Sequence, residues 1–348
     1  MDIALNKESA CRVLRSIRAG NTINVTQLGR MDLPVPNPGE GRTRWSKKLL
    51  RTTLPNIVHQ PPGHRIHVAS PTNRDRLCVT DVCNTIYENG LPQGAFMGIG
   101  SGVSISSPEM LFLEMGTVMS PVIQALLGFE LCGTYSRDPL NPRDGVITHF
   151  IPAASSVESI DAFLQKASNI RGLDQARLAL KWVRNNAWSA REAIVGLLMV
   201  MPVSELGYGF ENIVLNNRCD TSILVGPNGS RVPDITIGDT GVHLNYDGEV
   251  HLDDRERYVD DRRRDRELAA SGETVLVVTK EDLNENGGLD QVMLLAVEAI
   301  EHRGFGRMET VRSAIFDREL VARRQKLIWS LLTGRRGREL SLELAKES

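Results

Sequence analysis

Cysteine is scarce in this 348-residue chain, which contains five cysteines and no Cys-x-x-Cys pair. An odd number of scattered cysteines excludes a disulfide framework and a cysteine-based structural zinc site. Long apolar runs are also missing, because the longest, residues 193–203, is interrupted by Gly196 and Pro202. Such a run is too short to span a bilayer, and the start, MDIALNKES, lacks the layout of a signal peptide. We therefore expect a cytoplasmic protein that does not associate with membranes.

The chain also lacks an excess of positive or negative charge. The formal net charge is -2, with 24% charged and 41% hydrophobic residues, which is ordinary for a globular chain. This balance gives no global basic signature for nucleic acid, so any such binding must depend on local patches. The length favours two domains.

Residues 231–251 carry polar side chains in two short β-type runs around a turn at residues 238–241. Successive side chains on a strand point to opposite faces, so Asn245, Asp247 and Glu249 share one face of the second run. If the two runs pair, Asp234 lies beside that face. Converging oxygen atoms are what a hard divalent cation requires. The stretch therefore predicts a site for Mg²⁺, or Mn²⁺ in its place, with Asp234, Asn245 and Asp247 as ligands.

An ordered set of short motifs continues along the chain after these runs. It comprises Asp247-Gly248, His251, Arg263-Arg264-Asp265 in a charged helix, Gly272, Thr279 at the end of an apolar strand, and Asp282-Leu283. This order resembles the PD-(D/E)XK nuclease superfamily, and within it the very-short-patch-repair-like endonuclease domains of actinobacterial proteins. The match covers residues 189–300, about a third of the chain. It implies a restriction-endonuclease-like core, with a central mixed sheet flanked by helices, that cleaves DNA.

The resemblance assigns Asp234, Asp247, Glu192, Glu249 and His251 to catalysis. A bound Mg²⁺ would polarise the scissile phosphate and lower the pKa of the attacking water. Relatives usually have Glu where this chain has Asn245, and a neutral amide oxygen is the weaker ligand. Either Glu249 restores the missing charge or the charge is lost. His251 is either a general base or phosphate contact, or a structural residue at the end of a strand.

Glu192 has two explanations that do not exclude each other. Ser189 and Glu192 precede an apolar run with the spacing of a helix capping box, which accounts for both residues structurally. The resemblance instead places Glu192 near the metal, where it would orient water or the ion.

Two basic segments are candidates for contacts with the DNA backbone. Residues 42–51 place Lys47, Lys48, Arg51 and two further arginines around a tryptophan, which indicates either a phosphate-binding surface or a solvated helix face. Arg263 and Arg264 lie in residues 253–267, which hold seven acidic residues and six arginines. That helix fits DNA contact and internal i,i+4 ion pairs equally well.

The first half of the chain predicts a mixed α/β domain. Its features are a helix over residues 7–19, strands near residues 66–68 and 96–99, and a strand that runs into a helix capped by Ser107 with Pro108 as its first residue. A second apolar helix follows over residues 121–129. This pattern is similar to antitoxins of the AbiEi abortive-infection type, although residues 7–51 show no helix-turn-helix pattern.

The expected fold class is therefore α/β (α+β), in four segments. They are an AbiEi-like region (1–150), a connector with helices over 157–167 and 173–185 (151–187), a nuclease-like domain (188–303) and a basic helical tail (304–348).

Three functions remain open from the sequence. The first is a Mg²⁺-dependent DNA endonuclease acting in DNA repair or in defence against phage and mobile elements. It would be a homodimer if it cuts both strands. The second is a nuclease fold that has lost catalysis and serves as a DNA-binding, antitoxin-like transcriptional regulator with a toxin partner. The third is a protein-interaction module. Metal binding separates the first from the others, and salt-dependent DNA binding separates the second from the third.

Overall fold

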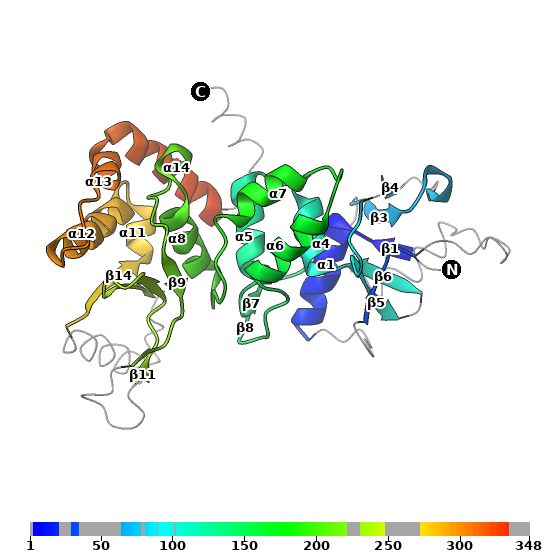
Figure 1. The fold of residues 1–348 in the computed structure, drawn as a ribbon, viewed down its shortest axis with the longest axis horizontal. Coiled ribbons are helices and arrows are strands. Elements are labelled where there is room, and N and C mark those ends of the chain that lie inside the picture. Colours follow the sequence, from blue (N-terminus) through cyan, green and yellow to red (C-terminus); the bar gives the residue numbers. More distant parts are fainter. Residues whose placement is uncertain are drawn as a thin grey trace. The chain divides into compact units, whose positions relative to one another are not determined.

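The computed structural model describes residues 3–20, 29–34, 64–77, 81–88, 90–100, 102–220, 230–247 and 272–333. The chain divides into two compact units, Met1–Val183 and Arg184–Ser348 (Figure 1). Each unit combines helices with a sheet, so the predicted α/β fold is confirmed. No helix within the described ranges is long and apolar enough to cross a membrane.

The sheet of the first unit is built around its first strand, which the sequence did not reveal. Within the described residues it has six strands in the order β2-β5-β6-β1-β3-β4. Their bounds are β1 Ile3–Leu5, β2 Gly29–Met31, β3 Ile66–Ser70, β4 Val82–Ile86, β5 Phe96–Gly100 and β6 Val103–Ser106. Strand β1 runs parallel to β6 and antiparallel to β3. All three residues of β1 are buried, so this short apolar segment lies inside the core.

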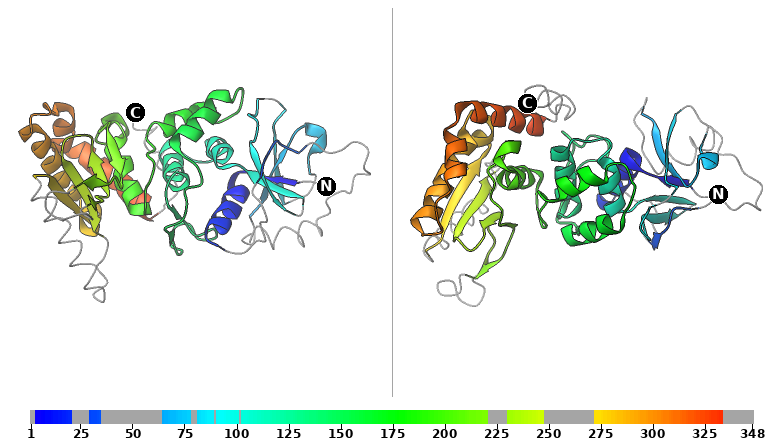
Figure 2. Two further views of the ribbon diagram at one scale, coloured as in Figure 1. Left: turned by 60° about the horizontal axis from the view of Figure 1, so that its bottom comes forward. Right: turned by 45° about the horizontal axis from the view of Figure 1, so that its top comes forward.

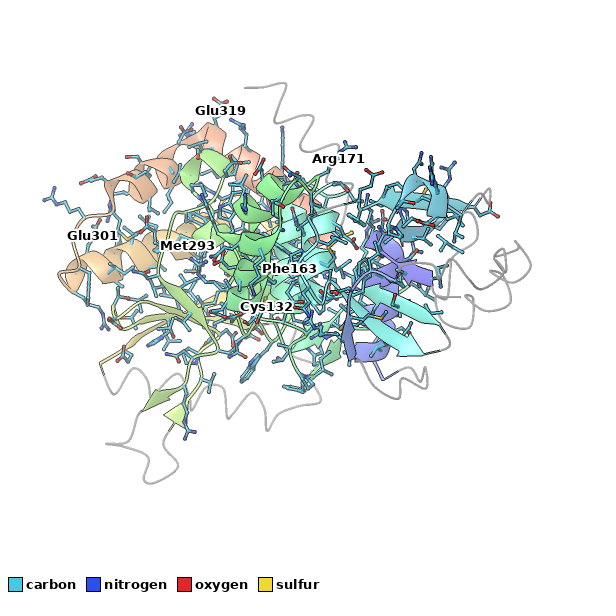
Figure 3. The ribbon with its side chains drawn as sticks, turned by 45° about the vertical axis from the view of Figure 1, so that its right-hand side comes forward. Cys132, Phe163, Arg171, Met293, Glu301 and Glu319 are labelled. Carbon is cyan, nitrogen blue, oxygen red and sulfur yellow. The ribbon has the colours of Figure 1, made fainter. Side chains whose placement is uncertain are left out.

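Helices pack on this sheet and on one another to form the core of the first unit. They are α1 Lys7–Arg18, α4 Pro108–Met115, α5 Pro121–Leu131, α6 Val157–Lys166 and α7 Leu173–Leu180. As predicted, Ser107 caps α4 by accepting a hydrogen bond from the Met110 N–H at 3.2 Å, and Pro108 is the first helical residue. Phe163 on α6 and Cys132 after α5 point into this helical body (Figure 3). Short elements complete the unit: η1 Asn73–Asp75, β7 Tyr135–Ser136 and β8 Thr148–His149.

The helices expected to form a connector belong to the first unit. Helix α6 packs on α4, and α7 packs on α4 and α5. Their buried faces, including Ile160 and Leu164 of α6, have the periodicity that the sequence indicated. The boundary between the units follows Val183, rather than flanking a separate helical segment.

The second unit contains a mixed sheet. In the described residues its order is β14-β13-β12-β9, with bounds β9 Ile213–Leu215, β12 Ile235–Ile237, β13 Val242–Asp247 and β14 Thr274–Thr279. Strand β12 is antiparallel to β9 and β13, whereas β13 and β14 are parallel. The turn between β12 and β13 lies where the sequence predicted it, with Gly238 and Gly241 at φ 47° and 68°. Glycine adopts these angles without steric cost. A short pair, β10 Cys219–Asp220 and β11 Ser230–Arg231, extends the unit.

Helices cover one face of this sheet, as Figures 1 and 2 show. They are α8 Ala190–Val200, η2 Val203–Glu205, α11 Lys280–Asn284, α12 Gly288–His302, α13 Glu309–Phe316 and α14 Arg318–Thr333. Helix α12 packs on β13 and β14, and α8 packs on β9. The side chains that fill this interface are apolar and buried: Ile213, Leu215, Ile235, Ile237, Val242, Leu244 and Val278.

The described part of the expected basic tail is an integral part of the second unit. Arg324 of α14 is fully buried and forms an ion pair with Asp290 of α12. Its Nε donates to the Leu206 carbonyl at 2.9 Å, and its guanidinium lies 4.3 Å from the ring centre of Tyr208. Removing one member of a buried pair leaves an uncompensated charge. Helix α14 is therefore docked by specific contacts.

Candidate functional site

Asp234 and Asn245 form a cross-strand pair at the end of β12 and β13. The Asp234 N–H donates to Asn245 Oδ1 at 3.1 Å, and the Tyr246 N–H donates to Asp234 Oδ2 at 2.6 Å. The Asp234 carbonyl accepts from the Asn216 N–H at 2.9 Å. Each polar side chain thus satisfies the backbone of the neighbouring strand. This arrangement lets polar residues occupy a half-buried strand end without unpaired backbone groups.

The face opposite the apolar core carries the predicted polar row. Ile235 pairs with Leu244 and Thr236 with His243, so Asp234 and Asn245 lie on the same face as Thr236 and His243. Asp247 follows two residues after Asn245 on this face and is exposed. The structure therefore brings together three of the predicted site residues, Asp234, Asn245 and Asp247.

Glu192 joins this group through Asn216, a residue that no sequence pattern singles out. The carboxylate of Glu192 accepts from Asn216 Nδ2 at 2.9 Å and from the Trp188 N–H at 3.0 Å, both at Oε2. Ser189 caps α8 by accepting from the Glu192 N–H at 3.1 Å. The Ser189 half of the predicted capping box is therefore present, whereas the carboxylate bonds to the N–H of Trp188, one residue before the N-cap.

Asn216 has a further property that bears on this site. It is 6% exposed, its Nδ2 donates to both Glu192 and the Asn186 carbonyl, and its Oδ1 has no partner among the described residues. Its backbone adopts φ 49°, which is unusual for a residue other than glycine. Buried unpaired polar atoms and unusual backbone angles concentrate at functional sites.

Two cations lie near the exposed end of β13. Burial raises the pKa of Tyr246, while the charges of Arg191 on α8 and Lys280 on α11 act to lower it. Lys280 directly follows Thr279, which pairs with Asp247 across the parallel strands. The parallel register of the two strands brings Lys280 to the end of β13, and the sequence alone does not show this register. Arg191, which precedes Glu192, lies on α8. This helix packs on β9, at the other edge of the sheet from β14.

The next pair of residues along the same face, Thr236 and His243, has hydrogen-bond partners within the protein. His243 is 3% exposed, its Nδ1 lies 3.0 Å from Thr236 Oγ1, and its Nε2 lies 3.3 Å from Glu273 Oε2. Burial lowers the pKa of His243, although Glu273 opposes this effect. These residues line a cavity of about 590 Å³ with Arg303, whose guanidinium donates to Thr274 Oγ1 and to the carbonyls of Thr240 and Gly272.

The oxygen donors on this face fit a hard divalent cation in kind. Asp234 and Asp247 supply carboxylates, and Asn245 supplies an amide oxygen. Within the described ranges, no group of three His, Cys, Asp or Glu side chains converges as a metal site. The remaining predicted residues (Glu249, His251, Arg263, Arg264, Lys47, Lys48 and Arg51) lie outside the described residues.

Thr279 and Asp282, which carried part of the nuclease resemblance, form a complete capping box at the start of α11. The Asp282 N–H donates to Thr279 Oγ1 at 3.3 Å, and the Thr279 N–H donates to Asp282 Oδ2 at 2.8 Å. These contacts fix the turn that presents Lys280. Comparisons of the chain with protein-family models, curated proteins and solved structures found no match.

Proposed function

We propose that the chain is a Mg²⁺-dependent DNA endonuclease whose catalytic group lies at the ends of β12 and β13. The observation that carries the proposal is the placement of Asp234, Asn245 and Asp247 on one face of a mixed sheet. A bound Mg²⁺, or Mn²⁺, would polarise the scissile phosphate and activate water. The resemblance of the sequence to very-short-patch-repair-like nucleases supports the same assignment.

The residues of the chain have separable tasks in this proposal. Asp234 and Asp247 supply the negative charge that holds the cation, and Asn245 fixes the position of Asp234. Lys280 and Arg191 neutralise the phosphate that approaches the exposed end of β13. Glu192 acts through Asn216, which contacts the backbone of Asp234, and is therefore a positioning residue. A homodimer would allow both strands of a duplex to be cut.

A second function is favoured by the same hydrogen bonds. The oxygen of Asn245 accepts from Asp234, and Glu192 Oε2 accepts from two donors, so both residues have structural explanations. A nuclease fold that has lost its metal would keep these contacts. It would act as a DNA-binding, antitoxin-like regulator with a toxin partner.

Calorimetric titration of Mg²⁺ and Mn²⁺ into the full chain separates the two functions. We expect binding to wild type, loss of binding to Asp234→Ala, and wild-type binding to Asp239→Ala. Asp239 is an exposed carboxylate in the turn of the same hairpin, so this control removes one charge nearby without touching the site. If wild type binds neither ion, the endonuclease proposal is wrong. Salt-dependent DNA binding then tests the regulator.

A further inference from the structure

A polar cavity of about 800 Å³ lies in the first unit, separate from the proposed nuclease site. Its lining comes from five places in the sequence: the start of α1, the start of η1, the end of β4, the end of α4 and the loop before α7. The residues that matter here are Lys7, Tyr87, Glu88, Glu114 and Arg171. A cavity of this size suits a small organic molecule.

The inner wall is a buried carboxyl group that is already satisfied. Glu114 is 1% exposed, accepts a hydrogen bond at Oε1 from the Lys7 N–H, and accepts at Oε2 from the Tyr87 hydroxyl at 3.0 Å. Burial raises the pKa of Glu114 to about 7, against the effect of these donors. Glu114 therefore carries only part of its charge near neutral pH and does not need a cation as partner.

The backbone beside this carboxyl is in an uncommon conformation. Lys7, the first residue of α1, has φ 47°, which costs on the order of 1 kcal/mol or more for a residue with a side chain. Asn6, just before it, is fully buried, and its side chain lies against the Tyr87 hydroxyl. A strained backbone beside a cavity is typical of ligand-binding sites.

Two cationic side chains, Lys7 and Arg171, line this cavity. No ion pair joins the Lys7 ammonium or the Arg171 guanidinium to a carboxylate within the described ranges. Arg171 reaches outward from the ribbon (Figure 3). The other acidic residue, Glu88, is exposed and remains hydrated.

We propose that this cavity binds a small organic anion, whose phosphate or carboxylate group is held between Lys7 and Arg171. Lys7 supplies a compact charge, and the planar guanidinium of Arg171 matches either group through two parallel hydrogen bonds. The Tyr87 hydroxyl and the Glu114 carboxyl, which are hydrogen-bonded to each other, form the polar inner wall that faces the remainder of the molecule.

The test is calorimetric titration of the full chain with inorganic phosphate in one arm and succinate in the other, at constant ionic strength. Saturable binding of either anion is expected, and the arm that binds identifies the group. Lys7→Gln and Arg171→Gln should each weaken binding by about tenfold or more, the loss expected for one charge-assisted hydrogen bond. Arg143→Gln, an exposed arginine of the same unit outside the lining, should bind as wild type.

Thermal unfolding of the same variants checks that they fold. Arg171 is exposed, so its substitution keeps the test decisive even if Lys7→Gln unfolds. Absence of saturable binding in both arms, or equal binding by wild type and Arg171→Gln, overturns the proposal. Neither result bears on Mg²⁺ binding by the second unit.

Discussion

Asp234 and Asn245 hold each other in place, because the Asp234 N–H donates to Asn245 Oδ1 at 3.1 Å while the Asp234 carboxylate accepts from the N–H of Tyr246, next to Asn245. This pairing needs an oxygen acceptor at position 245 but no charge. It explains how asparagine, with a neutral oxygen, can occupy this position without disturbing the strand. It also means that substitutions here change structure and chemistry together, so isosteric variants are needed to separate them.

Asp234→Asn and Asp234→Ala should differ in stability but not in metal binding. Asparagine keeps an oxygen that can accept from the Tyr246 N–H, whereas alanine leaves this donor unpaired. We expect alanine to lower the free energy of unfolding by about 1–3 kcal/mol and asparagine to lower it less. Both variants should lose Mg²⁺ binding and cleavage of DNA. Cleavage by Asp234→Asn at the wild-type rate would show that the site is assigned wrongly.

Restoring a carboxylate at position 245 should strengthen metal binding. Asn245→Asp keeps the acceptor for the Asp234 N–H and adds a negative charge on the same face. We expect Mg²⁺ to bind about tenfold or more tightly, since an extra charge near the ion contributes at least this much. Asn245→Glu, which also adds a carboxylate, should change the Mg²⁺ affinity in the same direction. Unchanged affinity in both variants would contradict a metal site at this strand end.

Glu192→Gln should show whether Glu192 only stabilises the start of α8 or also contributes to DNA cleavage. Glutamine retains an oxygen that can accept from the Trp188 N–H and Asn216 Nδ2, so the free energy of unfolding should change by less than about 1 kcal/mol. Glu192→Ala removes both contacts and should cost about 1–3 kcal/mol. If Glu192 positions the metal group, Glu192→Gln lowers the cleavage rate at saturating Mg²⁺. Cleavage at the wild-type rate would show that Glu192 has only a structural role at the start of α8.

The hairpin of the candidate site was predictable because its signals are local. Glycines at residues 238 and 241 set the turn, and alternation on the strands placed Asp234 beside Asn245 and Asp247. The cap of α8 by Ser189 and that of α4 by Ser107 followed from residue type and spacing. In these cases the residues that interact are neighbours in the sequence or in one hairpin.

The partners of these residues were not predictable, because they depend on pairing between distant segments. Asn216 reaches Glu192 only because α8 packs on β9, and it reaches Asp234 only because β9 pairs with β12. Lys280 reaches the site through the parallel register of β13 and β14. Strand β1 is too short to show a period, yet tertiary contacts place it between β6 and β3. Arg324 lies in the segment expected to be a basic helical tail, and its pairing with Asp290, distant in the sequence, allows its complete burial.

Lys280→Gln should weaken DNA binding without affecting Mg²⁺ binding. A lysine that contacts one phosphate releases about one counterion, so the slope of log affinity against log salt should fall by about 1. Lys326→Gln is the matched control, because Lys326 is an exposed lysine on α14 of the same unit. Binding should be measured by fluorescence anisotropy with duplex DNA at several salt concentrations. Equal slopes for both variants would exclude a phosphate contact by Lys280.

Glu114 should make the stability of the first unit fall as the pH rises. Burial raises its pKa from 4.5 to about 7 in the folded state. A raised carboxyl pKa favours folding fully below pH 4.5, and this contribution is lost progressively as the pH approaches 7, because the unfolded chain releases the proton first. The loss is on the order of 3 kcal/mol across this window. Tyr87 stays protonated throughout, because burial raises its pKa well above the ordinary value.

Glu114→Gln removes this titration while preserving the shape of the side chain. Between pH 4.5 and 7 the difference in unfolding free energy between variant and wild type should therefore shift in favour of the variant. Denaturant unfolding at fixed pH values measures it. Glu130 serves as a control with the opposite pH dependence. Arg15 lowers the pKa of Glu130 to about 2, although burial acts to raise it. The stability that Glu130 contributes is therefore lost only as the pH falls from 4.5 toward 2. A constant difference for Glu114→Gln across pH 4.5–7 would mean that the buried carboxyl is ionised throughout.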